Sequence, residues 1–121
     1  MKDKVILGLT EYVIVCGNNG TEAKGIARID TGATSSSIDY GLAGELQLGP
    51  ILRSKIVKSA AGIKKRPTIK VNVILKGINI KEEFTLADRS HMTYKMLLGQ
   101  NVLKKGNFLI DPLQNIEGME K

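Results

Sequence analysis

One aspartate follows a strand-like run and opens a loop of small and hydroxyl-bearing residues. Asp30 comes directly after the alternating segment 25–29, and Thr31 and Gly32 follow it. Gly32 allows a sharp turn, and the hydroxyls of residues 34–37 can hydrogen-bond to the local backbone. The tripeptide alone allows two interpretations. Asp30 is either a carboxylate presented at a strand end for chemistry, or a turn residue that accepts hydrogen bonds from nearby backbone N–H groups.

Two later segments give this aspartate a context. Apolar alternating runs at 51–57 and 68–75 flank a basic, glycine-containing stretch, which predicts a long β-hairpin with its polar tip at 58–66. Residues 95–103 place two apolar residues and a glycine before a short helix-like run. By itself the hairpin tip would be interpreted as an ordinary solvated loop. The three landmarks in this order are much less expected by chance than the tripeptide.

The order of these landmarks resembles the retropepsin pattern of retroviral aspartic proteases, Asp-Thr-Gly-Ala followed by apolar-apolar-Gly-x-Asn-x-Leu. The chain is more similar to a prokaryotic retropepsin-like family labelled "ATP-dependent zinc protease", and this similarity covers nearly the whole sequence. The similar blocks are residues 8–12, 27–33, 58–62, 84–92, 97–99 and 108–111. The resemblance implies a mainly β fold, a retropepsin-like closed β-barrel with one short C-terminal helix that functions as a homodimer.

Aspartic protease chemistry needs two carboxylates that lie too close together for both to ionise, so that the pair activates a water. This chain has one Asp-Thr-Gly and is too short for two lobes, so each protomer of a homodimer would contribute Asp30. The resemblance implies that Thr31 cross-links the two loops through its hydroxyl. It also implies that Gly32 lets the backbone approach the carboxylates and the substrate.

The resemblance also implies a substrate site and a support for the loop. A flap at about 58–66 would close over an extended peptide or protein substrate. The residues expected to bind substrate are Arg28, Ala33, Thr34, Ser59, Ala60, Ala61, Gly62 and Ile63. Leu97, Leu98 and Gly99 are expected to pack beneath the Asp30 loop. Some relatives are thought to act on glutamate chains, and the basic flap would suit an acidic or glutamate-rich peptide, although basic side chains at a loop tip are usually solvated surface.

The sequence departs from the family pattern at two positions. Thr34 stands where retroviral members commonly carry an acidic residue, and Gln100 stands where they carry arginine. This pair can form only a neutral hydrogen bond in place of an ion pair. Two other functions stay open: a retropepsin-fold module that binds peptides with little or no hydrolysis, and a basic β-barrel that binds RNA in a salt-sensitive way.

Composition predicts one β-rich domain over residues 1–121. Of the 121 residues, 42% are hydrophobic and only 4% aromatic, so the core must come from Ile, Val and Leu in short runs. The formal net charge is +6, but the basic residues lack interleaved aromatic side chains, so nucleic-acid binding is not expected. With no signal pattern and no membrane-spanning stretch, we expect a soluble cytoplasmic protein.

The sequence does not predict a metal site or another cofactor. The chain has one cysteine, Cys16, and one histidine, His91, which cannot supply the three or four ligands of a zinc centre. A P-loop signature is also absent. Cys16 lies in a strand-like run and is expected to be a small buried hydrophobic residue.

Hydrophobic periodicity predicts most of the elements. We expect strands at 4–9, 11–16, 22–29, 51–57, 68–75, 78–86 and 108–111, a helical turn at 40–46, and a helix at 99–104. Residues 88–91 are expected to form a polar connection. The tail 113–121 is expected to be loose or to contact a second subunit.

Overall fold

The computed structural model describes residues 3–60, 62–114 and 116, which form nine strands and two short helices. In chain order the elements are β1 (Val5–Leu7), β2 (Thr10–Cys16), β3 (Glu22–Ile29), β4 (Ser36–Asp39), α1 (Tyr40–Glu45), β5 (Ile51–Ser59), β6 (Gly62–Leu75), β7 (Ile78–Ala87), β8 (Met96–Leu98), α2 (Gln100–Leu103) and β9 (Phe108–Ile110). The prediction of a mainly β chain with a short helix near the C-terminal end is confirmed.

A closed barrel is the centre of the fold. The sheet order is β2-β3-β8-β4-β7-β6-β5, and β2 also pairs with β6 from Val13↔Leu75 to Cys16↔Asn72. Six strands therefore close on themselves, and β5 is added outside the ring along β6. Two pairings inside the barrel are parallel, β3 with β8 and β4 with β7. The predicted retropepsin-like closed barrel is confirmed.

Alternating aliphatic side chains fill the barrel. In β2 the buried positions alternate with partly exposed ones, and Val13 and Val15 are fully buried. Phe84 of β7 is the largest fully buried side chain. Cys16 occupies the outward phase of β2 and is only half-buried, which corrects the expectation that it lies in the core. Side-chain alternation within the strand is the reason.

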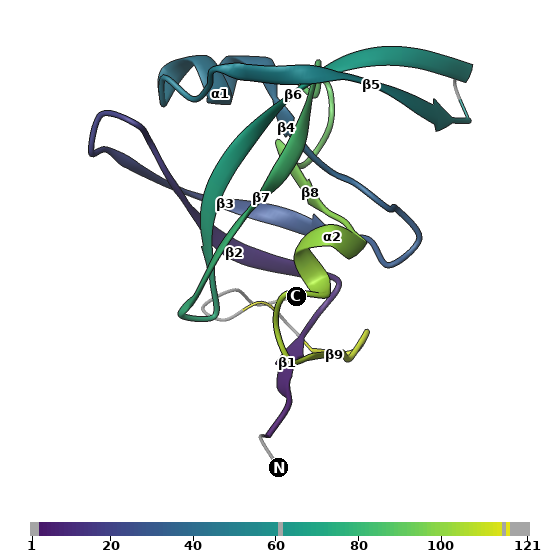
Figure 1. Ribbon diagram of the computed structural model, residues 1–121. Coiled ribbons are helices and arrows are strands. Elements are labelled where there is room, and N and C mark those ends of the chain that lie inside the picture. The colour runs from purple at the N-terminus through teal and green to yellow at the C-terminus, as the bar shows by residue number, and fades with distance from the viewer. Residues whose placement is uncertain (1–2, 61, 115, 117–121) are drawn as a thin grey trace.

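The β5–β6 hairpin is longer and more regular than the sequence predicts. Its strands pair continuously from Arg53↔Thr68 to Ser59↔Gly62, so two residues, 60 and 61, connect them instead of the nine-residue loop 58–66. Gly62 has φ +113°, a value that favours glycine. The basic residues 64–66 belong to β6, because an extended strand exposed to water accepts charged side chains. The hairpin projects across the top of the view in Figure 1.

A second, two-stranded sheet lies at the other end of the molecule. β1 pairs in parallel with β9, from Val5↔Phe108 to Leu7↔Ile110 (Figure 1). Of the tail 113–121, Leu113 is exposed, Gln114 Nε2 donates to the Ile6 carbonyl oxygen at 3.0 Å, and Ile116 is buried. The remaining tail residues lie outside the described ones. That the tail is loose or contacts a second subunit stays a prediction, as does the single domain over 1–121.

Within the described ranges, neither helix is long and apolar enough to cross a membrane.

Candidate active site

Asp30 lies at the end of β3, where the barrel fixes its backbone from two sides. Its N–H donates to the Leu98 carbonyl oxygen of β8 at 2.9 Å, and the preceding Ile29 N–H donates to the Leu9 carbonyl oxygen at 2.9 Å. The Asp30 side chain is partly exposed. Its Oδ1 accepts a hydrogen bond from Gly32 N–H at 3.0 Å, which is the bond expected of an Asx turn. One such bond leaves most of the acceptor capacity of the carboxylate for other groups.

Gly99 and its neighbours hold the Asp30 loop in place. Gly99 N–H donates to Ser36 Oγ at 2.9 Å, and Gln100 N–H donates to the Ala33 carbonyl oxygen at 2.8 Å. A Cβ on Gly99 would lie 2.7 Å from the Ser35 carbonyl carbon and 2.8 Å from the Ala33 carbonyl oxygen. Leu98 is fully buried below the loop and Leu97 is half-buried. The loop and the residues expected to support it are therefore in direct contact.

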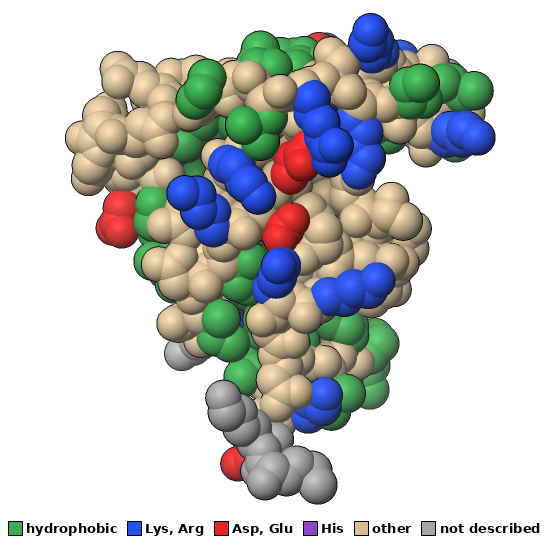
Figure 2. All heavy atoms as spheres, viewed as in Figure 1, with side chains coloured by type: hydrophobic (Ala, Val, Ile, Leu, Met, Phe, Trp, Pro, Cys, Tyr) green, Lys and Arg blue, Asp and Glu red, His purple; other side chains and the backbone are tan. Residues whose placement is uncertain are grey.

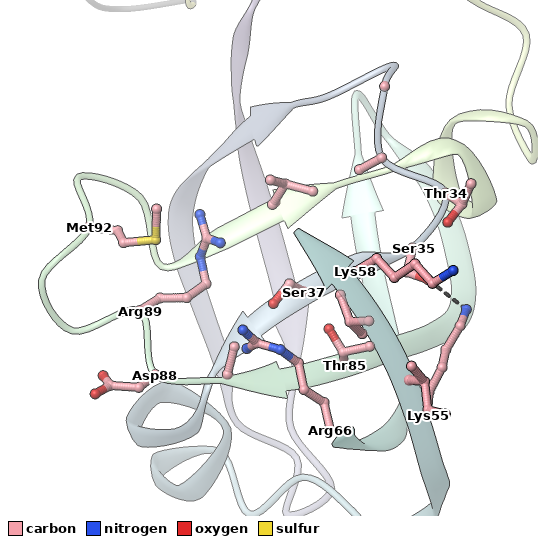
Figure 3. Close-up of a pocket in the computed structure, with 16 residues that line it drawn as sticks. Thr34, Ser35, Ser37, Lys55, Lys58, Arg66, Thr85, Asp88, Arg89 and Met92 are labelled. Atoms are coloured by element: carbon pink, nitrogen blue, oxygen red, sulfur yellow. Dashed lines mark hydrogen bonds between the residues drawn. The ribbon is translucent and has the colours of Figure 1, made fainter. Parts of the chain in front are cut away.

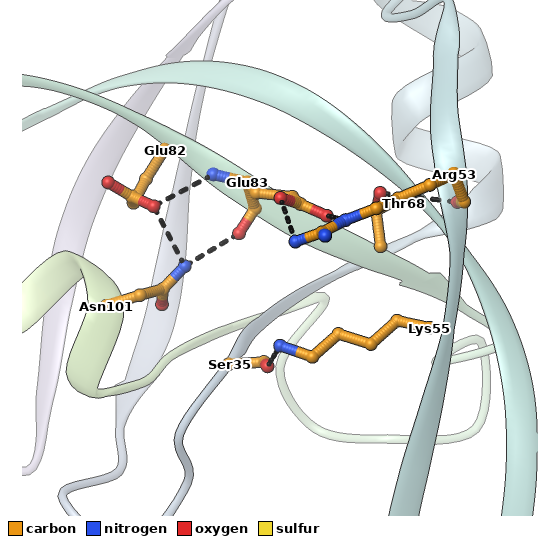
Figure 4. Close-up of polar contacts among 7 residues, drawn as sticks. All are labelled: Ser35, Arg53, Lys55, Thr68, Glu82, Glu83 and Asn101. Carbon is orange, nitrogen blue, oxygen red and sulfur yellow. Dashed lines mark hydrogen bonds and ion pairs between the residues drawn. The ribbon is translucent and has the colours of Figure 1, made fainter.

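Two polar residues in this support carry contacts that the sequence analysis missed. Ser36 is fully buried, and its Oγ donates to Asn101 Oδ1 at 2.7 Å. Asn101 Nδ2 donates in turn to the Glu83 carbonyl oxygen at 2.8 Å, which connects α2 to β7 (Figure 4). The asparagine of the Gly-x-Asn pattern was a signal for this contact, whereas the serine is one of three consecutive serines and cannot be chosen from sequence.

Thr34 and Gln100, the two departures from the family pattern, do not form the expected hydrogen bond with each other. Gln100 Nε2 donates to the Thr31 carbonyl oxygen at 2.8 Å, so its amide contacts the backbone of the Asp30 loop. Thr34 accepts a hydrogen bond on its own carbonyl oxygen from Asn101 N–H at 3.3 Å. Gln100 thus fixes the position of Thr31 rather than forming the expected hydrogen bond with the Thr34 side chain.

A pocket of about 530 Å³ lies between the Asp30 loop and the β5–β6 hairpin (Figure 3). Its lining residues are Gly32, Ala33, Thr34, Ser35, Ser37, Lys55, Ile56, Val57, Lys58, Arg66, Thr85, Ala87, Asp88, Arg89, Met92 and Leu97. The pocket brings together the loop, one face of the hairpin and the connection after β7. These segments are far apart in sequence, which is why sequence reasoning named few of the lining residues.

Several residues expected to bind substrate lie outside this lining. Arg28, Ala60, Gly62 and Ile63 are exposed and do not line the pocket, and Ile63 is 69% exposed. Ala61 and the side chain of Ser59 lie outside the described part of the chain. Among the residues expected to bind substrate, the pocket contains Ala33 and Thr34. The substrate roles of all these residues stay predictions.

The pocket lining is rich in positive charge. Lys55, Lys58, Arg66 and Arg89 line it, together with one acidic residue, Asp88. Figure 2 shows Lys and Arg side chains gathered around acidic ones on the face below the hairpin. Lys55 Nζ donates to Ser35 Oγ at 2.6 Å, which connects the hairpin to the Asp30 loop (Figure 4).

An ion pair attaches the hairpin to the barrel. Arg53 of β5 makes two bonds to the Glu83 carboxylate of β7, at 2.8 and 3.0 Å (Figure 4). The hydrogen bond from Arg53, and then one from Thr68, lowers the pKa of Glu83 to about 2. Together with the bond between Lys55 and Ser35, this pair holds the base of the hairpin against the barrel.

The family label raises the question of a metal site. Among the residues that the structure describes, His, Cys, Asp and Glu side chains form no group of three or more that could hold a metal ion.

The barrel, the aspartate loop at the end of β3 and the hairpin above it define a retropepsin-like protein. The family model described as "Retropepsin-like aspartic endopeptidase RimB" matches residues 43–117, which is more than half of the chain. The chain therefore belongs to the RimB-like family of retropepsin-like aspartic endopeptidases, which confirms the resemblance. The matched segment begins after the Asp30 loop.

Solved structures show the same fold. A Legionella pneumophila protein of unknown function (DUF785) matches with a TM-score of 0.66 and 20% identity, over 95% of this chain and 98% of that one. EIAV protease, in complex with the inhibitor HBY-793, matches with a TM-score of 0.63 and 23% identity, over 79% of this chain and 85% of that one. No match was found among the curated proteins.

Proposed function

We propose that this protein is a homodimeric aspartic endopeptidase in which two Asp30 carboxylates, one from each protomer, activate a water. The observation that carries the proposal is the position of Asp30 at a barrel strand end, fixed to Leu98 and two residues before Gly32. Gly32 lines the pocket under the hairpin, although Asp30 itself is not among the lining residues. One Asp30 would take a proton from the water as it attacks the peptide carbonyl carbon. The other, protonated, would donate to the carbonyl oxygen. Collapse of the tetrahedral intermediate would then return a proton to the leaving amine.

The exposed end of the Asp30 loop and exposed apolar side chains elsewhere on the molecule support the dimer. Thr31 and Gly32 are exposed at the end of the loop, so a second loop can approach them. Leu9, whose carbonyl oxygen binds the strand that delivers Asp30, is 53% exposed. Leu109 on β9 is 51% exposed and Leu113 is 80% exposed. Apolar side chains left in water are stabilised by burial, and a second protomer would bury them.

The substrate site is proposed to be the pocket below the hairpin. An extended peptide would lie against the loop residues Ala33 to Ser35, with the β5–β6 hairpin as the flap. Four basic lining residues against one acidic residue favour an acidic or glutamate-rich peptide. The bond between Lys55 and Ser35 would have to open or shift when the flap moves.

Peptide hydrolysis tests this proposal. Wild type, Asp30→Asn and Asp3→Asn are compared on a peptide library that includes glutamate-rich sequences, between acidic and neutral pH, with the molecular mass measured in parallel. The control Asp3→Asn makes the same chemical change at an exposed residue before β1, outside the Asp30 loop. We expect a dimeric wild type to cleave, Asp3→Asn to match it, and Asp30→Asn to be inactive.

Other outcomes decide against the proposal in distinguishable ways. A dimer that binds acidic peptides without cleaving them would make the protein a peptide-binding module of the same fold. A wild type that is monomeric at micromolar concentration would remove the second carboxylate and with it the proposed mechanism. Salt-sensitive binding of oligonucleotides that Asp30→Asn leaves unchanged would favour the RNA-binding interpretation.

A further inference from the structure

Two arginines meet in the pocket although they come from different parts of the chain. Arg66 lies on β6 opposite Lys55, and Arg89 lies in the connection after β7. Both line the pocket, and Figure 3 shows both guanidinium groups pointing into it. Burial, and then the positive charge of Arg66, lowers the pKa of the Arg89 guanidinium, so the two charges are near enough to repel each other.

The surroundings hold Arg89 rigidly in this unfavourable position. Arg89 is only 8% exposed, its N–H donates to Asp39 Oδ1 at 2.7 Å, and its Nε donates to the Tyr94 carbonyl oxygen at 3.0 Å. The sequence places Arg89 in a polar connection, where solvent exposure is expected. A buried arginine costs free energy unless it has partners, and its fixed fork suits binding of a planar oxyanion.

The nearby carboxylates are committed to other donors. Asp39 Oδ2 accepts from the backbone N–H groups of Gly41 and Leu42, and its Oδ1 accepts from the backbone of Arg89 rather than from the guanidinium. Asp88 lines the pocket, but its Oδ1 accepts from Ser90 N–H at 3.0 Å and Ser90 Oγ at 2.6 Å. In Figure 3 the Asp88 carboxylate points away from the two guanidinium groups.

Arg66 carries an incomplete set of contacts. Its Nε is buried and has no hydrogen-bond partner among the described residues. A buried donor without an acceptor is unfavourable, and an acceptor supplied by a ligand removes this cost. The Asp39 charge offsets part of the cost for Arg89, whereas Arg66 has a buried donor with no partner among the described residues. Two guanidinium groups that line one pocket in this way are an arrangement for binding an anion.

We propose that Arg66 and Arg89 form a carboxylate-binding subsite that selects peptides with an acidic side chain next to the cleaved bond. This deepens the proposed function and rests on it. Lys55, whose Nζ donates to Ser35 Oγ in the structure, is not assigned to the subsite. Gly32 and Ala33, two and three residues after Asp30, line the same pocket, so the selected side chain would lie in the pocket that the Asp30 loop borders.

Matched peptides test the subsite. Peptides that differ by one Glu→Gln substitution, scanned along the sequence and with amidated C-termini, are cleaved by wild type, Arg66→Gln, Arg89→Lys and Lys70→Gln. Lys70 is an exposed residue of β6 outside the pocket, so its variant removes the same charge without touching the subsite. The amide caps exclude recognition of the peptide C-terminal carboxylate, and a free-acid series measures that source separately.

We expect the wild type to prefer Glu over Gln at one position by about tenfold or more in kcat/KM, mainly through KM. Arg66→Gln and Arg89→Lys should lose most of this preference, measured for each variant as its ratio of kcat/KM for the Glu and Gln peptides, so that a general change in activity cancels. Lys70→Gln should retain it. Arg89→Lys keeps the charge but not the fork, so a loss in this variant distinguishes paired hydrogen bonds from simple attraction.

The inference is overturned if Lys70→Gln loses the preference as much as Arg66→Gln, because the overall charge would then be the cause. It is also overturned if only the free-acid peptides are preferred. Binding of the same peptides to Asp30→Asn, followed by fluorescence anisotropy, separates the two proposals. A Glu preference in binding that depends on Arg66, without hydrolysis by wild type, sustains the subsite and refutes the peptidase. Hydrolysis by the wild type without any Glu preference sustains the peptidase and refutes the subsite.

Discussion

Replacement of Gly99 by alanine tests the close packing between the Asp30 loop and the residues before α2. Gly99 has φ −98° and ψ −169°, an extended conformation open to any residue, so the effect of Gly99→Ala is steric rather than conformational. The new Cβ would lie 2.7 Å from the Ser35 carbonyl carbon and 2.8 Å from the Ala33 carbonyl oxygen. The nearest atom to the new Cβ would be the Ser35 carbonyl oxygen. Because carbon contacts are optimal at about 3.5–4.0 Å, the 2.7 Å contact with the Ser35 carbonyl carbon by itself requires a movement of roughly 0.8–1.3 Å.

The cost of this movement follows from the contacts it disturbs. Forcing a methyl group into a packed site costs about 1–3 kcal/mol, and weakening the hydrogen bond from Gln100 N–H to the Ala33 carbonyl oxygen costs about 1 kcal/mol more. The lower backbone entropy of alanine in the unfolded chain returns about 0.4–1 kcal/mol. We therefore expect Gly99→Ala to lower the free energy of unfolding by about 1–3 kcal/mol, with a fall in Tm of roughly 4–12 °C.

Urea denaturation and thermal unfolding, followed by circular dichroism, measure this change. The matched control is Gly44→Ala in α1, where a Cβ would meet nothing within 4 Å. Because glycine is a poor helix former, the control should be unchanged or more stable by up to about 1 kcal/mol. Peptide hydrolysis by Gly99→Ala should fall more than its folded fraction, since the loop that carries Asp30 is displaced. A Gly99→Ala protein as stable and as active as wild type would refute the packing argument.

Two further substitutions probe the supports around the site. Asp39→Ala removes the acceptor for three backbone N–H groups, including that of buried Arg89. The substitution should lower the free energy of unfolding, measured in urea, by about 2–3 kcal/mol, and Asp39→Asn should be intermediate. Equal stability of the wild type and both variants would contradict this. The pKa of Glu83 is lowered from 4.5 to about 2, mainly by Arg53, so its contribution is complete above about pH 5 and is lost as the pH falls toward 2. The Tm difference between wild type and Glu83→Gln should therefore shrink over this interval, and a difference that is constant from pH 7 to 2 would rule out this ion pair as a stabilising contact.

Local patterns predicted seven of the nine strands in the described part of the chain, because strand and helix periods are properties of neighbouring residues. The short strands β4 and β8 were not predicted, since three or four residues are too few to show a period. The range 22–29 was predicted as a strand and is β3 with the same bounds, and the helical turn predicted at 40–46 is α1. The Asp30 loop was also visible, since a strand, a carboxylate and glycine in succession need no distant partner. Residues 58–66 were wrongly predicted as a loop because their charge was interpreted as a loop signal. The residues after Gly62 instead form backbone hydrogen bonds with β5.

The chemistry of the pocket depends on contacts between distant residues. Ser36 and Asn101 are 65 residues apart, and the backbone of Arg89 reaches Asp39 across 50 residues. Asp39 and Arg89 meet because β4 pairs in parallel with β7, and Ser36 meets Asn101 at the end of β8, which pairs with β4. Parallel strands are joined by long crossovers, and such pairings leave no local pattern in sequence. Arg89 illustrates the limit, because its neighbours in sequence are polar whereas its neighbours in space bury it.

The sequence by itself determined the family pattern, the β-rich class and the strand-to-loop position of Asp30, all of which depend on residue order over short spans. Only the tertiary structure decided the extent of the hairpin, the partner of Gln100 and the meeting of Arg66 with Arg89. Barrel closure sets these features, because it fixes which strand ends and connections share a face. Whether a charge lies in water or in a pocket follows from that closure rather than from the residue type.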